Sequence, residues 1–209
     1  MTRRIPIVTA VVVGLSALVY LLPCGASLEY SRHAILAGEW WRLVTGHWVH
    51  FSPQHFLYDT AAFGIAGWMI ESRGHRNFGW LCVLAVFVIS GTMLLCNPQL
   101  QMCGGLSGMA VAAVVFLALN GLEERGPWQW ICGSALILCA AKLIGEEMTG
   151  QFFVLHAPAG FALVPSNHIA GALTALAVYA CPRIAARFST FDPLTSQTAS
   201  ATIYSHRDP

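Results

Sequence analysis

The sequence predicts an all-α fold: a polytopic membrane protein with a bundle of six transmembrane helices. Hydrophobic residues make up 56% of the 209 residues and charged residues only 10%, whereas a soluble domain has about 25% charged residues. The mean hydropathy is +0.61. Apolar runs of helix length recur between short polar breaks, and about 17–25 such residues span the hydrocarbon layer of a membrane.

Net charge and cysteine spacing narrow the classes of function. A formal net charge of +1 gives no electrostatic reason to expect nucleic acid or an acidic partner. The seven cysteines form no C-x-x-C pair, so a zinc ribbon is not indicated.

The first element covers residues 5–22, an uncharged run preceded by Arg3 and Arg4. A signal peptide is the alternative, but its apolar core usually has about 7–15 residues. We therefore expect the first transmembrane helix here. The loop over residues 23–53 carries Trp40, Trp41 and Trp48, and tryptophan is enriched at membrane interfaces.

Five more helices are expected, at residues 54–70, 78–95, 106–119, 128–144 and 168–181. The fourth and sixth of the six helices are short for a span and start at polar breaks, as if inside a water-filled cavity. Residues 1–188 form one membrane domain. Residues 189–209 form a polar, Ser/Thr-rich cytoplasmic tail, which we expect to be disordered.

Six helices place both termini on one side of the membrane, and basic residues decide which side. With both termini cytoplasmic, most of the 11 basic residues face the cytoplasm. These are Arg3, Arg4, Arg73, Arg76, Arg125, Arg183, Arg187 and Arg207. The others, Arg32, Arg42 and Lys142, face outward or lie near the outer edge.

A serine between glycines marks the start of the fourth helix, in the stretch Cys-Gly-Gly-Leu-Ser-Gly-Met over residues 103–109. Ser107 stands in the first helical turn, where backbone N–H groups lack intrahelical partners. Such a serine can act as a nucleophile beside amides that hold an oxyanion. The alternative is a Gly/Ser packing face or a helix cap.

The sixth helix begins with His168, at the same predicted depth as Ser107. Gly171, Ala172 and Ala175 share the face of His168, since residues three, four and seven apart are neighbours on a helix. Small residues let membrane helices approach closely. The sequence therefore predicts a Ser–His dyad, and a hydrogen-bonded structural histidine is the alternative.

A third polar group precedes and enters the second helix: His47, His50, His55 and Asp59. Ionisable residues inside a membrane are costly, and function is the default explanation for them. These four side chains could also ligate zinc. Structural hydrogen bonding is the further alternative for His47 and His55.

The chain resembles the rhomboid family of intramembrane serine proteases over about residues 39–181. Trp41-Arg42 is similar to the family's Trp-Arg pair, and His50, His55 and Asp59 resemble its H-x4-H-x3-N element. Gly105-Leu106-Ser107-Gly108 matches the G-x-S-G nucleophile motif, and His168-Ile169-Ala170-Gly171 matches H-x-x-G. Together, and in this order, the motifs are highly specific.

The resemblance implies that Ser107 is the nucleophile and His168 the general base. Amides near Ser107, with His50, would form the oxyanion hole. The supporting residues would be His55, Asp59, Gly105, Leu106, Gly108 and Asn167. The family uses no cofactor. Its partners are the transmembrane segment of a protein substrate and membrane lipid, with no nucleic acid.

Asp59 departs from the family pattern, which has asparagine there, and an ionised carboxylate cannot donate a hydrogen bond. This aspartate, the Thr45-Gly46-His47 context and the short chain are similar to the rhombosortase branch. That likeness implies cleavage of GlyGly C-terminal anchors of exported proteins. It also implies a multi-pass protein of the bacterial inner membrane, with its active site opening toward the periplasm. Hydrolysis and transfer to another nucleophile both stay open.

Two local expectations concern the surroundings of the site. Residues 145–167 are expected to form a lid, whose apolar side chains would cover the site: Phe152, Phe153, Val154, Leu155 and Phe161. Cys96 and Cys103 could close a disulfide in an oxidising compartment, or remain small buried hydrophobes.

Two other functions are compatible with parts of the pattern. A catalytically inactive rhomboid-like protein would bind client transmembrane helices, but it would not need both Ser107 and His168. A small transporter would show repeat symmetry between its halves, and we find none.

Overall fold

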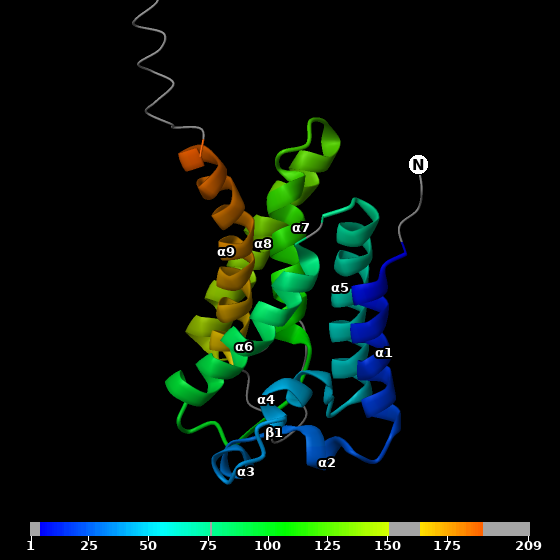
Figure 1. Cartoon of the computed structure of the whole chain (residues 1–209), viewed down its shortest axis with the longest axis vertical. Helices are drawn as coiled ribbons and strands as arrows, with labels where there is room; N and C mark the ends of the chain where they lie inside the picture. The colour runs from blue at the N-terminus through cyan, green and yellow to red at the C-terminus, as the bar shows by residue number, and fades with distance from the viewer. Residues whose placement is uncertain (1–4, 76, 151–163, 190–209) are drawn as a thin grey trace, which may run out of the picture.

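Helices dominate the fold, as predicted. The structure, a computed structural model, describes residues 5–75, 77–150 and 164–189. Among these residues, six long helices lie in a bundle (Figure 1): α1 (Ile7–Leu21), α5 (Pro53–Ser72), α6 (Phe78–Cys96), α7 (Ser107–Gly121), α8 (Pro127–Thr149) and α9 (Pro165–Ser189). The first turn of α1 and the last turn of α9 lie at the same end of the bundle.

The number of membrane spans stays a prediction. Within the described ranges, only α6 is long and apolar enough to cross a membrane by length and composition. Helices α1 and α7 are apolar but shorter. The predicted six-span topology, with both termini cytoplasmic, therefore rests on the sequence pattern.

Several helices are longer than the apolar pattern predicts. Helix α5 begins at Pro53 behind the cap Ser52, whose Oγ accepts a hydrogen bond from the N–H of His55 at 3.1 Å. Helix α8 continues to Thr149, and Gly150 ends it in the left-handed region at φ 64°. Helix α9 begins at Pro165, so His168 lies inside its first turn.

Short elements occupy the segment that the sequence predicts as a loop. They are α2 (Gly25–Leu28), β1 (Tyr30–Ser31), α3 (Arg32–Leu36), α4 (Arg42–Thr45) and the 3-10 helix η1 (Gly46–Trp48). They gather at one end of the bundle (Figure 1). The buried guanidinium of Arg42 holds them together, because it donates to Ala26 O at 2.9 Å and Glu29 O at 3.0 Å.

A two-stranded antiparallel sheet ties this end of the bundle to the loop before Ser107. Strand β1 pairs with β2 (Met102–Cys103), with Tyr30 opposite Cys103. Past the sheet, the N–H of Gly105 donates to Gly46 O at 3.2 Å. The segment leading into α7 is therefore fixed by residues far earlier in the chain.

Helix α7 is the centre of the bundle, and most of its residues are buried. Its closest approach is to α9, where Gly171 lies against the backbone of Gly108. A Cβ added to Gly171 would lie 2.1 Å from Gly108 O. The predicted small-residue contact between these helices is therefore present, and Ala175 is also fully buried.

His47 has a structural role. Its side chain is buried, and its Nε2 lies 3.0 Å from Ser90 Oγ and 3.3 Å from Val86 O. Since a carbonyl oxygen only accepts, Nε2 carries the hydrogen for Val86. Burial lowers the pKa of His47 from 6.5 to about 4, so the native side chain stays neutral until the pH is well below neutrality.

The burial of His47 predicts acid sensitivity. The unfolded state takes up a proton as the pH falls below 6.5, whereas the folded state does so only near its pKa of about 4. The free energy of unfolding therefore loses nothing to this histidine above pH 6.5, and it falls by about 3 kcal/mol as the pH is lowered to 4. The measurement is the Tm of detergent-solubilised protein across this range. The Tm of His47→Gln should depend less on pH than the Tm of the wild type. Equal pH dependence of the two Tm values would contradict the prediction.

Candidate functional site

Ser107 is the first residue of α7, and the backbone before it is sharply turned. Gly105 has φ 129°, in the left-handed region that favours glycine. A Cβ there would lie 2.6 Å from His55 Nε2. Leu106, fully buried, caps the helix. The N–H groups of the first turn lack intrahelical acceptors, so Ser107 stands beside backbone donors.

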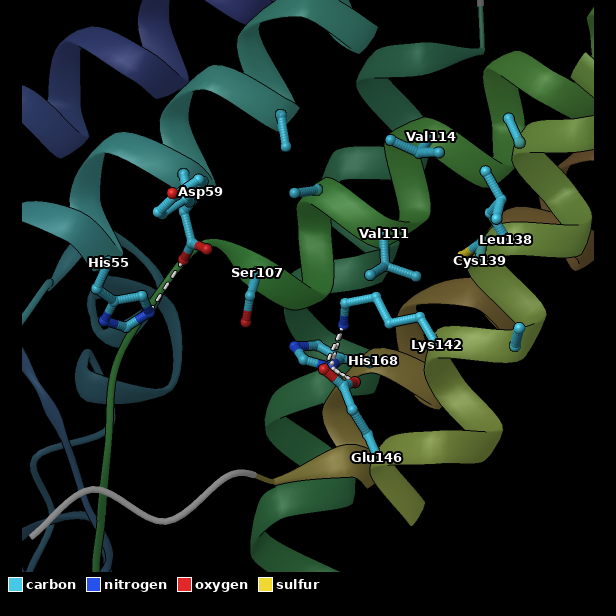
Figure 2. Close-up of a pocket in the computed structure, with 15 residues that line it drawn as sticks. His55, Asp59, Ser107, Val111, Val114, Leu138, Cys139, Lys142, Glu146 and His168 are labelled. Atoms are coloured by element: carbon cyan, nitrogen blue, oxygen red, sulfur yellow. Dashed lines mark hydrogen bonds and ion pairs between the residues drawn. The ribbon is translucent and has the colours of Figure 1, made fainter. Parts of the chain in front are cut away.

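A cavity of about 510 Å³ opens in front of Ser107. It lies between α5, α7, α8 and α9, and its walls are mostly apolar, including Ala110, Val111, Val114 and Leu138. The polar side chains that line it are His55, Asp59, Ser107, Lys142, Glu146 and His168. Figure 2 shows Ser107 between two groups: His55 with Asp59, and Lys142 with Glu146 and His168.

The structure brings Ser107 and His168 to the same cavity. His168 is buried, and Ser107 is half-buried. Among the described residues no hydrogen bond joins the two side chains. Catalytic hydrogen bonds are often long in a protein without substrate. The close contact of α7 and α9 at Gly171 sets the separation of the two side chains.

Asp59 lies between two imidazoles. Its Oδ2 is 3.1 Å from His55 Nε2 and 3.4 Å from His50 Nε2, within ion-pair distance but without hydrogen-bond alignment. His50 Nδ1 lies 3.1 Å from Trp48 O. A carbonyl only accepts, so Nδ1 carries a hydrogen. A proton is then needed between His50 Nε2 and Asp59, and either an imidazolium facing a carboxylate or a protonated Asp59 supplies it.

Two other predicted residues lie apart from this polar group. His47 contacts Ser90 and Val86 rather than Asp59, so the four-residue zinc set is not brought together. Asn167 lies against Gly108: its backbone carbonyl oxygen would be 3.0 Å from a Cβ added to Gly108. Its Nδ2 contacts Cys103 Sγ at 3.7 Å. Asn167 lines a second cavity, of about 30 Å³, with Gly105, Ser107 and Gly108.

The possible disulfide is not formed. Cys96 and Cys103 are both free thiols. Burial raises the pKa of the Cys103 thiol to about 11, which makes this thiol a poor nucleophile. The Cys103 side chain instead contacts Asn167 Nδ2, and Cys103 pairs with Tyr30 across the sheet.

Glu146 is the residue that the sequence analysis missed. It is 1% exposed, its Oε2 lies 2.7 Å from His168 Nδ1, and its Oε1 lies 2.6 Å from Lys142 Nζ. The predicted helix end at residue 144 was wrong, and so was the placement of Glu146 in a lid. The signal available was Lys142 and Glu146 four residues apart, a helical pair in an apolar segment. The lid residues 151–163 lie outside the described residues.

Comparison with known proteins gives one family. Residues 37–183 match the family model described as Rhomboid domain. This match covers well over half of the chain and contains every residue that lines the cavity. A comparison with curated proteins finds no match.

Proposed function

The chain belongs to the rhomboid family of intramembrane proteases, and from this premise we propose that it is a serine endopeptidase with a Ser107–His168 dyad. One observation carries the proposal. The two side chains come from the first turns of α7 and α9, and both line one cavity. No cofactor is needed for this chemistry.

The mechanism follows from the positions of the polar groups. Ser107 Oγ attacks the scissile carbonyl carbon while His168 takes the hydroxyl proton. The oxyanion is held by first-turn amides of α7. His50 adds a donor only by turning one N–H away from Trp48 O or Asp59, the groups that its two nitrogens face in the structure. His168 then gives the proton to the leaving amine, and a second nucleophile, water in hydrolysis, releases the acyl group.

The substrate proposed is the transmembrane anchor of an exported protein, with a GlyGly C-terminal anchor as in the rhombosortase branch. The cavity supports this choice, because its walls are apolar and several of its side chains are small, including Ala62, Ala110 and Ala135. A glycine pair has no side chain and unwinds from a helix readily. We place the active site toward the periplasmic face of the inner membrane, in a multi-pass chain.

Labelling and product analysis test the function. A fluorophosphonate should label Ser107 in purified protein, and a GlyGly-tailed substrate should be cut near the anchor. The mass of the product distinguishes hydrolysis from transfer to another nucleophile. No labelling and no cleavage would favour the inactive relative that only binds client helices.

Asp59→Asn tests how the oxyanion hole works. If Asp59 holds His50 as an imidazolium, asparagine removes the counter-ion. We expect the rate to fall about tenfold, the difference between a charged and a neutral hydrogen bond. The alkaline limb of the pH–rate profile should move toward acid.

The competing idea is that a protonated Asp59 donates directly. Asparagine also donates, so it would then keep most of the activity and the pH profile would not move. Thr60→Val is a control on the next residue of α5, because the Thr60 hydroxyl donates to Phe56 O within the helix. This control should retain the wild-type pH profile.

A further inference from the structure

We propose that Glu146 is a positioning residue for His168, which turns the Ser107–His168 dyad into a triad, and that Lys142 fixes the orientation of Glu146. This inference rests on the proposed function. It goes beyond it, because the proposed dyad assigns no group to the second nitrogen of His168.

The contacts of His168 decide which nitrogen carries the hydrogen. Its Nδ1 lies 2.7 Å from Glu146 Oε2 and 3.4 Å from Lys142 Nζ. An ammonium group only donates and an ionised carboxylate only accepts. Nδ1 therefore cannot serve both, and the shorter contact makes it the donor to Glu146. In the neutral ring Nε2 then keeps its lone pair, and it is the atom that can take the proton of Ser107.

The charges of the three groups fit this arrangement. Glu146 is 1% exposed, so its carboxylate needs a partner to stay ionised. Lys142, one helical turn earlier, supplies it at 2.6 Å. When His168 accepts the proton, the adjacent carboxylate stabilises the imidazolium. Helix α8 therefore positions the base on α9 (Figure 2).

Replacing Glu146 by glutamine should reverse the tautomer. Lys142 can only donate, so it forms its hydrogen bond with the amide oxygen of the glutamine. The amide NH2 then faces His168 Nδ1, which must accept. The hydrogen moves to Nε2, and Nε2 can no longer act as a base. A wrong tautomer of this kind lowers kcat by roughly 10³-fold while substrate binding changes little.

A second variant separates this effect from misfolding. In Lys142→Met/Glu146→Gln no charge is left in the pair, and the amide is free to turn its oxygen toward Nδ1. The kcat of this double variant should be about tenfold or more above that of Glu146→Gln. The control is Glu147→Gln, because Glu147 is the exposed neighbour on the same helix. Its kcat should stay within about twofold of the wild type.

The experiment combines kinetics with a readout that does not need activity. Values of kcat and KM are measured with a GlyGly-tailed substrate. The tautomer of His168 is read from ¹⁵N-histidine NMR spectra, assigned by comparison with His168→Ala. We expect the Nδ1–H form in the wild type and in the double variant, and the Nε2–H form in Glu146→Gln.

Two results would overturn the role of Glu146: wild-type kcat in Glu146→Gln, or an Nδ1–H tautomer retained in that variant. Both leave the proposed function intact as long as Ser107→Ala is inactive. An unlabelled Ser107 and uncut substrate in the wild type would instead refute the proposed function, whatever the tautomer of His168.

Discussion

Ser107→Ala is expected to abolish cleavage, and His168→Ala should do the same. Removing the nucleophile or the base of a serine protease lowers kcat by on the order of 10⁶-fold. Groups that act as one unit are not additive, so the double variant should be no slower than either single variant. Cleavage of a GlyGly-tailed substrate by purified protein in detergent or in vesicles measures this effect.

Folding has to be shown separately for these variants. Ser107 is half-buried and faces the cavity, so Ser107→Ala should keep the Tm and elution volume of the wild type. Substantial cleavage by Ser107→Ala would end the serine-protease interpretation. A double variant markedly slower than both single variants would show that Ser107 and His168 do not act as a unit.

Gly171→Ala should also lower the rate strongly, although the change adds only one methyl group. Its Cβ would lie 2.1 Å from Gly108 O and 3.0 Å from Gly108 C, both of them backbone atoms that cannot swing aside. Helices α7 and α9 must then separate by about 1 Å. A displacement of that size costs about 10²-fold in rate, and overpacking costs about 1–3 kcal/mol of stability.

The matched control for Gly171→Ala is Gly91→Ala. Gly91 lies in α6, and an added Cβ there meets nothing within 4 Å. Alanine is the better helix former by up to about 1 kcal/mol, so this variant should keep full activity and an equal or higher Tm. Equal behaviour of the two variants in rate and in Tm would contradict the role of the Gly171 contact.

The apolar runs predicted where the long helices lie but not where they end. Hydrophobic periodicity stops at Ile144, whereas α8 continues through Thr149. Those last turns are polar on the sequence, yet Glu146 is buried there through Lys142 and His168. From sequence alone, a charged pair that a residue of another helix buries cannot be distinguished from an exposed polar turn. The short elements α2 to α4 were missed for a similar reason, because tertiary contacts of Arg42 hold them.

The sequence predicted those residues of the candidate site that stand at a helix start or at helical spacing from one another. Ser107 and His168 stand at helix starts, and the small-residue stripe beginning at Gly171 indicated the contact of α7 and α9. The pairing of Asp59 with His55 followed from one helical turn, and the structure adds His50. Glu146 could not be assigned to His168, because nothing in the spacing shows which helix packs against α8.

The position of His168 on α9, the last helix of the described residues, has a consequence for biosynthesis. A nascent chain carries His50, Asp59 and Ser107 well before α9 is made, so it holds a serine hydroxyl with no base beside it. During that time the backbone of Gly108 also lacks its contact with Gly171. Activity and the last helix–helix contact therefore arise in the same step. If Ser107 and His168 act as proposed, a chain stalled before α9 is inert toward neighbouring membrane proteins.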